Sequence, residues 1–361
     1  MFEGFVGHED IKSFLLTMLI AGCGGVLFAV IQFPLAWLIG AMLATTIASI
    51  AGVRVWVPQW LRITMIAVLG IMLGSAFSPE MVAEMGRWIM PLVVLALFVL
   101  LVTFVGAAYF NKVAGYDPVT AYFSATPGGM TEMALVGEQY GADIRVISLG
   151  HATRVLITVG TIPVWFRFVE GLDMPVMPAT GTGFADLIWF DVMVLAACGM
   201  IGAPLGTVMK IPAGRLVGPM LLSAVAHITG VIHAGPPPSI VAVAQVVVGA
   251  SIGMRFVGLT MRELRGITFH AAVISVIFVL LAALVGGLVG PVVDIPPIAM
   301  ILALAPGGLS EMSLVALAIG IETAFVSSMH IARIILIVLA GPLVFRASHR
   351  DAKIEQNDRA R

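Results

Sequence analysis

Charged residues are scarce in this chain. Only 11% of its 361 residues are Asp, Glu, Lys or Arg, and 60% are hydrophobic, whereas ordinary soluble domains carry roughly 25% charged residues. The mean hydropathy is +1.08. This composition excludes a soluble globular protein and indicates an integral membrane protein with several spans. The net charge of −1 provides no basic field of the kind that attracts nucleic acid.

Cysteine is almost absent as well. Cys23 and Cys198 lie within apolar stretches and are typical of small packing residues, although their similar places in the two halves of the chain leave a disulfide or a metal pair open. The 7 histidines are scattered without the paired spacing of a metal site. A cleavable signal peptide is not expected, because the acidic N-terminus carries a single basic residue, Lys12, before the first apolar run. We therefore expect no metal and no cofactor.

What the chain does contain is a motif that occurs twice. The two copies are Pro127-Gly128-Gly129-Met130-Thr131-Glu132-Met133 and Pro306-Gly307-Gly308-Leu309-Ser310-Glu311-Met312, which stand 179 residues apart. Further polar residues match at the same offset: Ser148 with Ser327, His151 with His330, and Arg154 with Arg333. Identical polar residues at one offset inside apolar sequence predict an internal duplication.

The apolar runs divide the chain into two membrane repeats. The first covers 11–168 and the second 187–346, with a linker rich in Pro and Gly at 169–186 and a charged cytoplasmic tail at 347–361. The expected spans are 14–31, 35–52, 63–77, 89–110 and 144–166, then 187–208, 213–231, 239–256, 266–290 and 323–345, with interrupted segments at 118–140 and 297–319. We therefore expect an all-α integral membrane fold of about ten transmembrane helices and two broken or re-entrant segments.

Basic residues predict how the repeats are oriented. In the first repeat they precede the first span and follow the second and fourth, whereas in the second repeat they follow the first and third. A loop that carries basic residues in one repeat therefore lacks them in the other, so the positive-inside rule predicts two inverted repeats. Inversion requires an odd number of crossings in each repeat, which favours re-entrant Pro-Gly-Gly segments and cytoplasmic termini. If those segments cross fully, an early hairpin is the non-crossing element instead.

The Pro-Gly-Gly segment is expected to break a helix at membrane depth. Proline ends a helix and glycine lets the backbone turn, but unpaired backbone groups are costly in hydrocarbon, so the break must lie inside protein or beside a water-filled cavity. A second half-helix should follow with a positive N-terminal dipole, which Thr131 and Ser310 would cap. The alternative is a tight turn between two short core helices.

Glu132 and Glu311 are the sharpest functional candidates. An ionisable group inside a bilayer is a functional-site hypothesis by default, and here we expect a site for a coupling ion or an anion. The alternative is a structural salt bridge with Arg154 and Arg333.

A polar stripe follows each motif. Spacing by three residues places each Ser-His-Arg set on one helix face, which suits a proton or anion site, and hydrogen bonding between packed spans explains it equally well. The candidate residues for substrate or ion binding are Pro127, Gly128, Gly129, Thr131, Glu132, Ser148, His151, Arg154, Pro306, Gly307, Gly308, Ser310, Glu311, Ser327, His330 and Arg333.

The paired Pro-Gly-Gly-x-[Thr/Ser]-Glu-Met motifs, each followed by a His-x-x-Arg helix, resemble the duplicated AbrB-type membrane protein family of Gram-negative bacteria. The resemblance covers about residues 11–346, and the family is distinct from the small soluble DNA-binding regulator of the same name. It implies regulation of gene expression, and members have also been labelled ammonia monooxygenases. The residues support neither label: they provide no copper or iron site and no segment long and polar enough to read DNA.

The inverted architecture with broken helices resembles instead the cation/proton antiporter and anion symporter group of transporters. We therefore expect a multi-pass protein of the bacterial inner membrane that is not an enzyme and that transports a small solute coupled to H⁺ or Na⁺. The alternative is a membrane regulator or sensor that affects gene expression indirectly, and an oxidase subunit is a third reading. The expected partners are membrane lipid and the solute with its ion; nucleic acid is not contacted directly, and a homodimer is left open.

Overall fold

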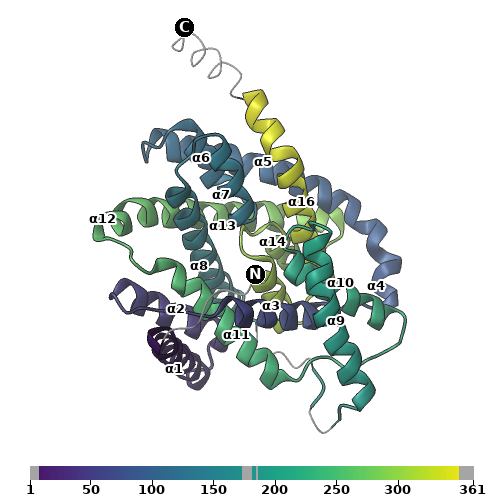
Figure 1. Cartoon of the computed structure of the whole chain (residues 1–361). Coiled ribbons are helices and arrows are strands. Elements are labelled where there is room, and N and C mark those ends of the chain that lie inside the picture. Colours follow the sequence, from purple (N-terminus) through teal and green to yellow (C-terminus); the bar gives the residue numbers. More distant parts are fainter. Residues whose placement is uncertain (1–7, 173–180, 184–185, 349–361) are drawn as a thin grey trace.

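The computed structural model describes residues 8–172, 181–183 and 186–348. These residues form helices joined by turns and loops, with no strand among them (Figure 1), so the predicted all-α class is confirmed. Much of the linker expected at 169–186, and all but the first two residues of the tail expected at 347–361, lie outside the described residues.

The helices follow the apolar runs of the sequence. Those of the first half are α1 (His8–Val30), α2 (Ala36–Ile50), α3 (Gln59–Gly74), α4 (Pro79–Glu84), η1 (Met85–Trp88), α5 (Ile89–Lys112), α6 (Pro118–Ala125), α7 (Met130–Gln139) and α8 (Ile144–Phe168). Those of the second half are α9 (Trp189–Val208), α10 (Gly214–Ile228), α11 (Pro238–Gly253), η2 (Met254–Phe256), α12 (Met261–Glu263), η3 (Leu264–Thr268), α13 (Phe269–Val289), η4 (Gly290–Val293), α14 (Pro297–Leu304), α15 (Leu309–Ala318) and α16 (Thr323–Ser348).

Seven of the described helices are long and apolar enough to cross a membrane. They are α1, α5 with η1, α8, α9, α11 with η2, α13 with its flanking turns, and α16. The other predicted spans correspond to α2, α3 and α10, which have 15, 16 and 15 residues. Each is therefore only about 22–24 Å long, against a hydrocarbon core of about 30 Å. The chain is a multi-pass membrane protein with seven candidate spans and several shorter apolar helices.

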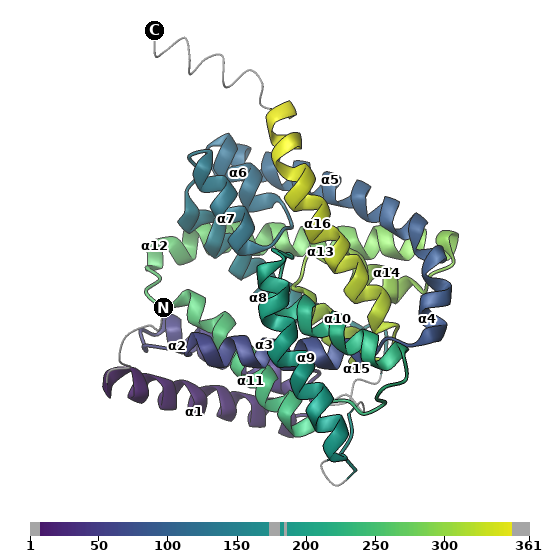
Figure 2. The same cartoon turned by 45° about the vertical axis from the view of Figure 1, so that its right-hand side comes forward.

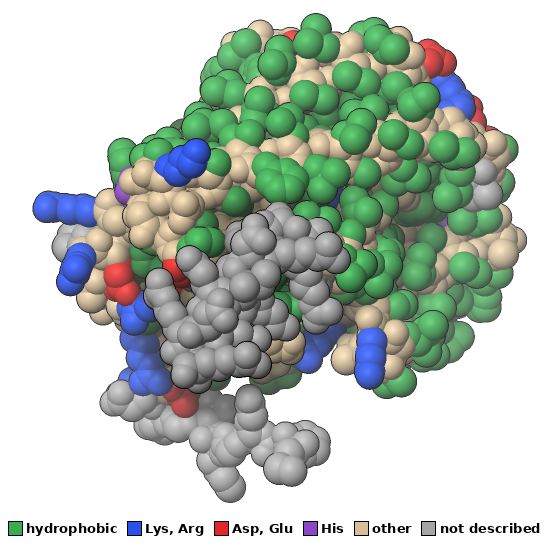
Figure 3. Space-filling model, turned by 90° about the horizontal axis from the view of Figure 1, so that it is seen from above, with side chains coloured by type: hydrophobic (Ala, Val, Ile, Leu, Met, Phe, Trp, Pro, Cys, Tyr) green, Lys and Arg blue, Asp and Glu red, His purple; other side chains and the backbone are tan. Residues whose placement is uncertain are grey.

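Hydrophobic side chains cover the outside of the bundle. Figure 3 shows them over much of one face, with charged side chains gathered towards its edges. α1 and α9 are among the least buried candidate spans, and they expose large side chains such as Leu19, Leu27, Trp189 and Met200. In water such surfaces would be unstable, whereas lipid tails accept them.

The helices form two groups. The first group contains α1, α2, α3, α9, α10 and α11, and the second contains α5 to α8 with α13 to α16. In Figure 2 the first group fills the lower part of the molecule, and α5, α6, α7 and α13 fill the upper part. The main contacts between the groups join α3 to α15 and α16, and join α2 and η2 to α8. Both interrupted segments belong to the second group.

Glycines allow close packing within the first group. A Cβ added at Gly70 or Gly74 of α3 would meet the backbone of α10, and one added at Gly249 of α11 would meet the carbonyl of Leu38 on α2. The pair of α3 with α10 is therefore packed like the pair of α11 with α2. Helix pairs that rely on such small residues are typical of membrane proteins.

Candidate functional site

The helix interruptions lie where the sequence predicts them. α6 ends at Ala125 and α7 begins at Met130, while α14 ends at Leu304 and α15 begins at Leu309. The Pro-Gly-Gly residues, 127–129 and 306–308, are outside any helix. The prediction of a broken helix at both motifs is confirmed.

Each interrupted segment folds back as a hairpin. In the first, the backbone N–H of Asp143, just past α7, donates to Thr120 Oγ1 in the first turn of α6 at 2.9 Å. In the second, Arg87 forms an ion pair with Asp294, ahead of α14, and also interacts electrostatically with Glu322, just past α15. The two ends of each hairpin therefore lie on the same side of the bundle.

Proline leaves one carbonyl without its helical partner at each break, and a histidine takes that place. In an unbroken helix the N–H at position 127 would donate to the carbonyl of Phe123, but Pro127 has no N–H. His151 Nε2 donates to the Phe123 carbonyl at 3.0 Å. At the second break, 179 residues later, His330 Nε2 donates to the carbonyl of Leu302 at 2.9 Å.

The two arginines bind the broken backbone itself. Each guanidinium donates to two carbonyls on either side of the motif's proline: Arg154 to Thr126 (3.2 Å) and Gly128 (3.3 Å), and Arg333 to Ala305 (2.6 Å) and Gly307 (2.8 Å). Both arginines are buried. They supply the hydrogen bonds that lipid cannot give to an interrupted helix.

The hydrogen bonds also fix the state of the histidine rings. Arg154 Nη2 lies 3.3 Å from His151 Nδ1, and Arg333 Nη2 lies 2.9 Å from His330 Nδ1. A guanidinium only donates and a carbonyl only accepts, so Nδ1 must accept and Nε2 must carry the proton. Both histidines are therefore neutral rings whose two nitrogens are occupied. Of the two readings of the His-Arg face, this geometry favours hydrogen bonding between packed helices.

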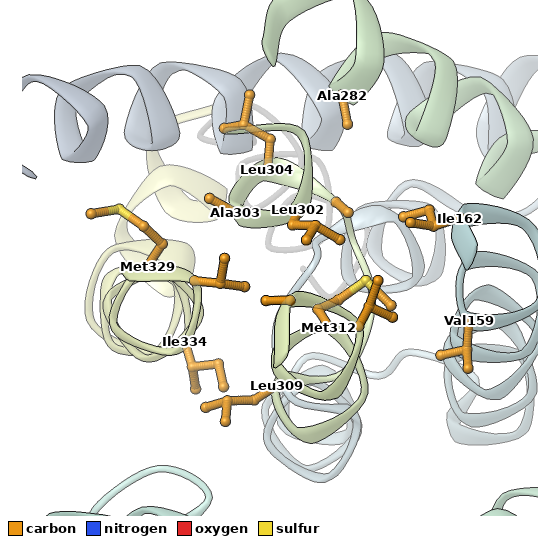
Figure 4. Packing of buried hydrophobic residues seen from close by; sticks show 14 of the residues in the cluster. Val159, Ile162, Ala282, Leu302, Ala303, Leu304, Leu309, Met312, Met329 and Ile334 are labelled. Carbon is orange, nitrogen blue, oxygen red and sulfur yellow. The ribbon is translucent and has the colours of Figure 1, made fainter. Parts of the chain in front are cut away.

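The first glycine of each motif makes room for the motif's methionine. A Cβ at Gly128 would contact Met133 and Ile337, and a Cβ at Gly307 would contact Met312. Both methionines are buried, and Figure 4 shows Met312 inside the hydrophobic cluster between α14 and α8. A larger residue at either glycine would force this packing apart.

The second glycine makes room for the motif's glutamate. A Cβ at Gly129 would overlap the Glu132 carboxylate, and a Cβ at Gly308 would overlap that of Glu311. Each glutamate is the third residue of its helix, so its carboxylate folds back over the helix N-terminus. This is the position of a capping-box glutamate, and the helix dipole favours a negative charge there.

Two expectations about these helix starts are wrong. The N-cap residues are Gly129 and Gly308, with no side-chain cap hydrogen bond, so Thr131 and Ser310 lie two residues too late to cap. Among the described residues, neither motif glutamate forms an ion pair. The salt-bridge alternative fails because both arginines already bind backbone carbonyls.

The two motifs differ in burial. Glu311 is 7% exposed, whereas Glu132 is partly exposed. Ser327 is buried and donates to Ser313 Oγ at 2.8 Å, whereas Ser148, its match in the first half, is partly exposed. The second motif is therefore the more enclosed of the two.

Sequence reasoning missed two arginines beside the motifs. Arg255 contacts the sulfur of Met130, the first residue of α7. Arg62 and Arg255 interact electrostatically with each other and with Glu311. The duplication could not identify them, because neither has an arginine at the matching position of the other half.

The structure also places the possible metal ligands and the two cysteines. Within the described ranges no group of three His, Cys, Asp or Glu residues is arranged to hold a metal ion. Cys23 and Cys198 are both free, one exposed and one buried. The disulfide that the sequence left open is not formed.

A family profile described as "Transition state regulatory protein AbrB" matches residues 37–349, which include both motifs and both His-x-x-Arg helices. The chain belongs to the AbrB family. It is 27% identical to "Uncharacterized protein YhjN" of Bacillus subtilis over 94% of each chain. It is 26% identical to "Putative regulator AbrB" of Escherichia coli over 88% of this chain and 91% of that relative.

Proposed function

We propose that this AbrB family protein is a secondary transporter of a small solute, coupled to H⁺ or Na⁺. The observation that carries the proposal is the pair of broken-helix hairpins, in which a carboxylate lies over the N-terminus of α7 and of α15. Interrupted helices inside a membrane protein are typical of transporters, because their free ends can bind a solute or an ion. The support is that His and Arg side chains bind the carbonyls of each break and so hold it open in a fixed shape.

The proposal includes two repeats of inverted topology. Its support is that α2 packs on α11 as α10 packs on α3, a reciprocal exchange expected of a two-fold relation. α5 and α13, which are equivalent in the two halves, run side by side in opposite directions in Figures 1 and 2. In this arrangement α2, α3 and α10 cross the membrane with the seven longer spans, and both termini are cytoplasmic.

The two helix groups would be the parts that move. They meet mainly through α3 with α15 and α16, and through α2 and η2 with α8, so one group can tilt against the other without disrupting its own packing. Glu132 and Glu311 would bind the coupling ion at this boundary. Each neutral histidine and its neighbouring arginine would keep the break that they bind rigid during the movement.

Uptake into proteoliposomes tests the proposal. Purified protein would be reconstituted and supplied with a panel of labelled small solutes, with and without an inward H⁺ or Na⁺ gradient, and compared with protein-free liposomes. The proposal expects uptake of at least one solute that depends on the gradient. Uptake that never exceeds the protein-free control would contradict it.

A second candidate is a membrane regulator or sensor that affects gene expression indirectly. It is favoured by the description of the family and by the printed name of the Escherichia coli relative. The described residues form a helical bundle with seven candidate membrane spans, so a regulator of this kind would act through a partner protein. Direct binding of a signalling protein, together with no transport of any solute, would favour this candidate.

A further inference from the structure

Two arginines of the first helix group lie against the broken helices of the second. Arg62 is in the first turn of α3, and Arg255 is in η2, which directly follows α11. They interact electrostatically with each other and with Glu311 on α15. Arg255 also contacts Met130 at the start of α7. Arg255 therefore lies at the start of α7, and α3, which carries Arg62, packs on α15 across the boundary between the groups.

Neither guanidinium has an oxygen partner within the described ranges. Neither forms an ion pair within 4.0 Å, and the contact of Arg255 is to a thioether sulfur, which is a weak acceptor. Both side chains are partly buried. By contrast, three other arginines pair with carboxylates: Arg54 with Asp10, Arg87 with Asp294, and Arg145 with Glu263.

The charge at this boundary is unbalanced. Arg215, at the start of α10, adds a third positive charge that acts on Arg62. Glu311 and, at the start of α7, Glu132 supply two negative charges, but each carboxylate folds back over its own helix, and within the described residues neither forms an ion pair with an arginine. Like charges at a partly desolvated position repel one another, and the positive ends of two helices add to the same field. An anion between them would relieve this repulsion.

We propose that Arg62 and Arg255 bind a small oxyanion, a carboxylate or phosphate group, between α3, η2 and the N-terminal ends of α7 and α15. The planar guanidinium groups match such a group because each can donate two parallel hydrogen bonds to it. The inference rests on the proposed transport function and names its substrate class as an anionic solute. Glu311, beside the same arginines, would then bind the coupling cation next to the anion.

Ligand-dependent thermal stability tests the site. Purified full-length protein in phosphatidylcholine nanodiscs would be titrated with acetate, succinate or inorganic phosphate at constant ionic strength, with glucose and choline as controls. At least one oxyanion should raise the Tm in a saturable manner. Arg62→Gln and Arg255→Gln should each raise the half-saturating concentration about tenfold or more, the loss expected for one charge-assisted contact. Arg262→Gln, at an exposed arginine of α12, should leave it unchanged.

Two further arms decide the source of the anion and the cause of any loss. Arg255→Lys keeps the positive charge and should retain the Tm of the free protein, yet bind the oxyanion more weakly because it cannot donate the planar pair. The same variants would be compared in nanodiscs that contain phosphatidylglycerol. Stabilisation by this lipid that requires both arginines, with no response to soluble anions, would assign the site to a lipid headgroup and overturn the solute assignment.

The inference is overturned if none of the three anions stabilises the protein, or if both Gln variants keep the wild-type half-saturation. Transport is measured separately. Arginine-dependent anion binding without gradient-driven uptake would support the anion site and contradict the proposed transport function. Gradient-driven uptake of a cation or neutral solute without anion binding would support the transport function and contradict the anion site.

Discussion

His330 Nε2 donates a hydrogen bond to the Leu302 carbonyl at 2.9 Å. In an unbroken helix that carbonyl would accept from residue 306, which is a proline and has no N–H. His151 and Phe123 stand in the same relation at 3.0 Å. The His-x-x-Arg helices therefore supply from side chains the donors that the prolines remove from the backbone.

Replacing His330 by Ala should lower the free energy of unfolding by about 1–3 kcal/mol, because a buried carbonyl loses its donor. Pro306→Ala restores a backbone N–H at that position, so the double variant should recover part of the loss. Thermal unfolding of both variants in one detergent measures this coupling, with His233→Ala at an exposed histidine as the control. Equal losses in the single and double variants would show that His330 acts by packing alone.

Replacing Gly308 by Ala should destabilise the protein by about 1–3 kcal/mol, because the new Cβ overlaps the carboxylate of Glu311. Adding Glu311→Ala removes the overlap, so the combined loss should be smaller than the sum of the single losses. Gly287→Ala in α13 is the control, since its Cβ would meet nothing within 4 Å, and it should be neutral or stabilising by about 0.5–1 kcal/mol. Strictly additive losses would show that the glycine is not required by the glutamate.

The broken helices could be predicted because their cause is local. Proline and glycine act on the backbone within a few residues, so the interruptions at 127–129 and 306–308 follow from the sequence alone. The apolar runs likewise give the helices, although α2, α3 and α10 are shorter than a full span. Their length depends on tight turns, such as the left-handed residue Leu35 ahead of α2, which hydropathy does not register.

The roles within the site could not be predicted, because they depend on which helices meet. Nothing in the spacing of Arg154 tells whether it faces a carboxylate or a carbonyl, and the structure places it on the carbonyls of the break. The cap positions depend on where the helix restarts, and a restart at Met130 makes Gly129 the cap instead of Thr131. Arg255 reaches the site from a distant helix, so no local pattern marks it.

The raised pKa of Glu322 predicts that its effect on stability depends on pH. Glu322 lies between α15 and α16, outside the membrane-spanning helices, where partial burial and the neighbouring Glu84 raise the pKa of its carboxyl above the ordinary 4.5, against the opposing charge of Arg87. A raised folded-state pKa gives stability that is present below the ordinary pKa and is lost as the pH rises through the folded-state pKa. Glu322→Gln should therefore raise the Tm at pH 7 and change it little at pH 4.

A carboxylate with the opposite shift provides the control for that measurement. A hydrogen bond from Ser78 lowers the pKa of Glu80, so its contribution is present above the ordinary pKa and is lost as the pH falls. Glu80→Gln should lower the Tm slightly at pH 7 and not raise it. A higher Tm at pH 7 for both variants would show that the effect of Glu322→Gln comes from the change in net charge and not from the raised pKa of Glu322.

Reporter fusions should test the inverted topology directly. The positive-inside rule predicts that fusions at 54–62 and at 210–215 both read cytoplasmic, although these loops are not equivalent in the two halves. The linker at 169–186 should read periplasmic. Activity of a cytoplasmic reporter in the linker would leave each half with an even number of crossings, and the two repeats would then be parallel.

Replacing Glu132 or Glu311 by Gln should separate ion coupling from structure. Glutamine still accepts a hydrogen bond at the helix N-terminus, and neither Arg154 nor Arg333 loses a partner, because both bind carbonyls. The free energy of unfolding should therefore fall by less than about 1 kcal/mol. Gradient-driven uptake should be abolished, since an amide can neither exchange a proton nor give a cation its negative charge.

Of the two variants, Glu311→Gln should lower the free energy of unfolding more, because that carboxylate is only 7% exposed and interacts electrostatically with Arg62 and Arg255. Unfolding and uptake would be measured on one preparation, with Glu138→Gln, at an exposed glutamate of α7, as the control. A large loss of stability without a loss of uptake per folded molecule would make the glutamates helix caps alone. Uptake at the wild-type rate in both variants would contradict the coupling role of the two glutamates. The anion site of the arginines is tested separately, by the binding measurement.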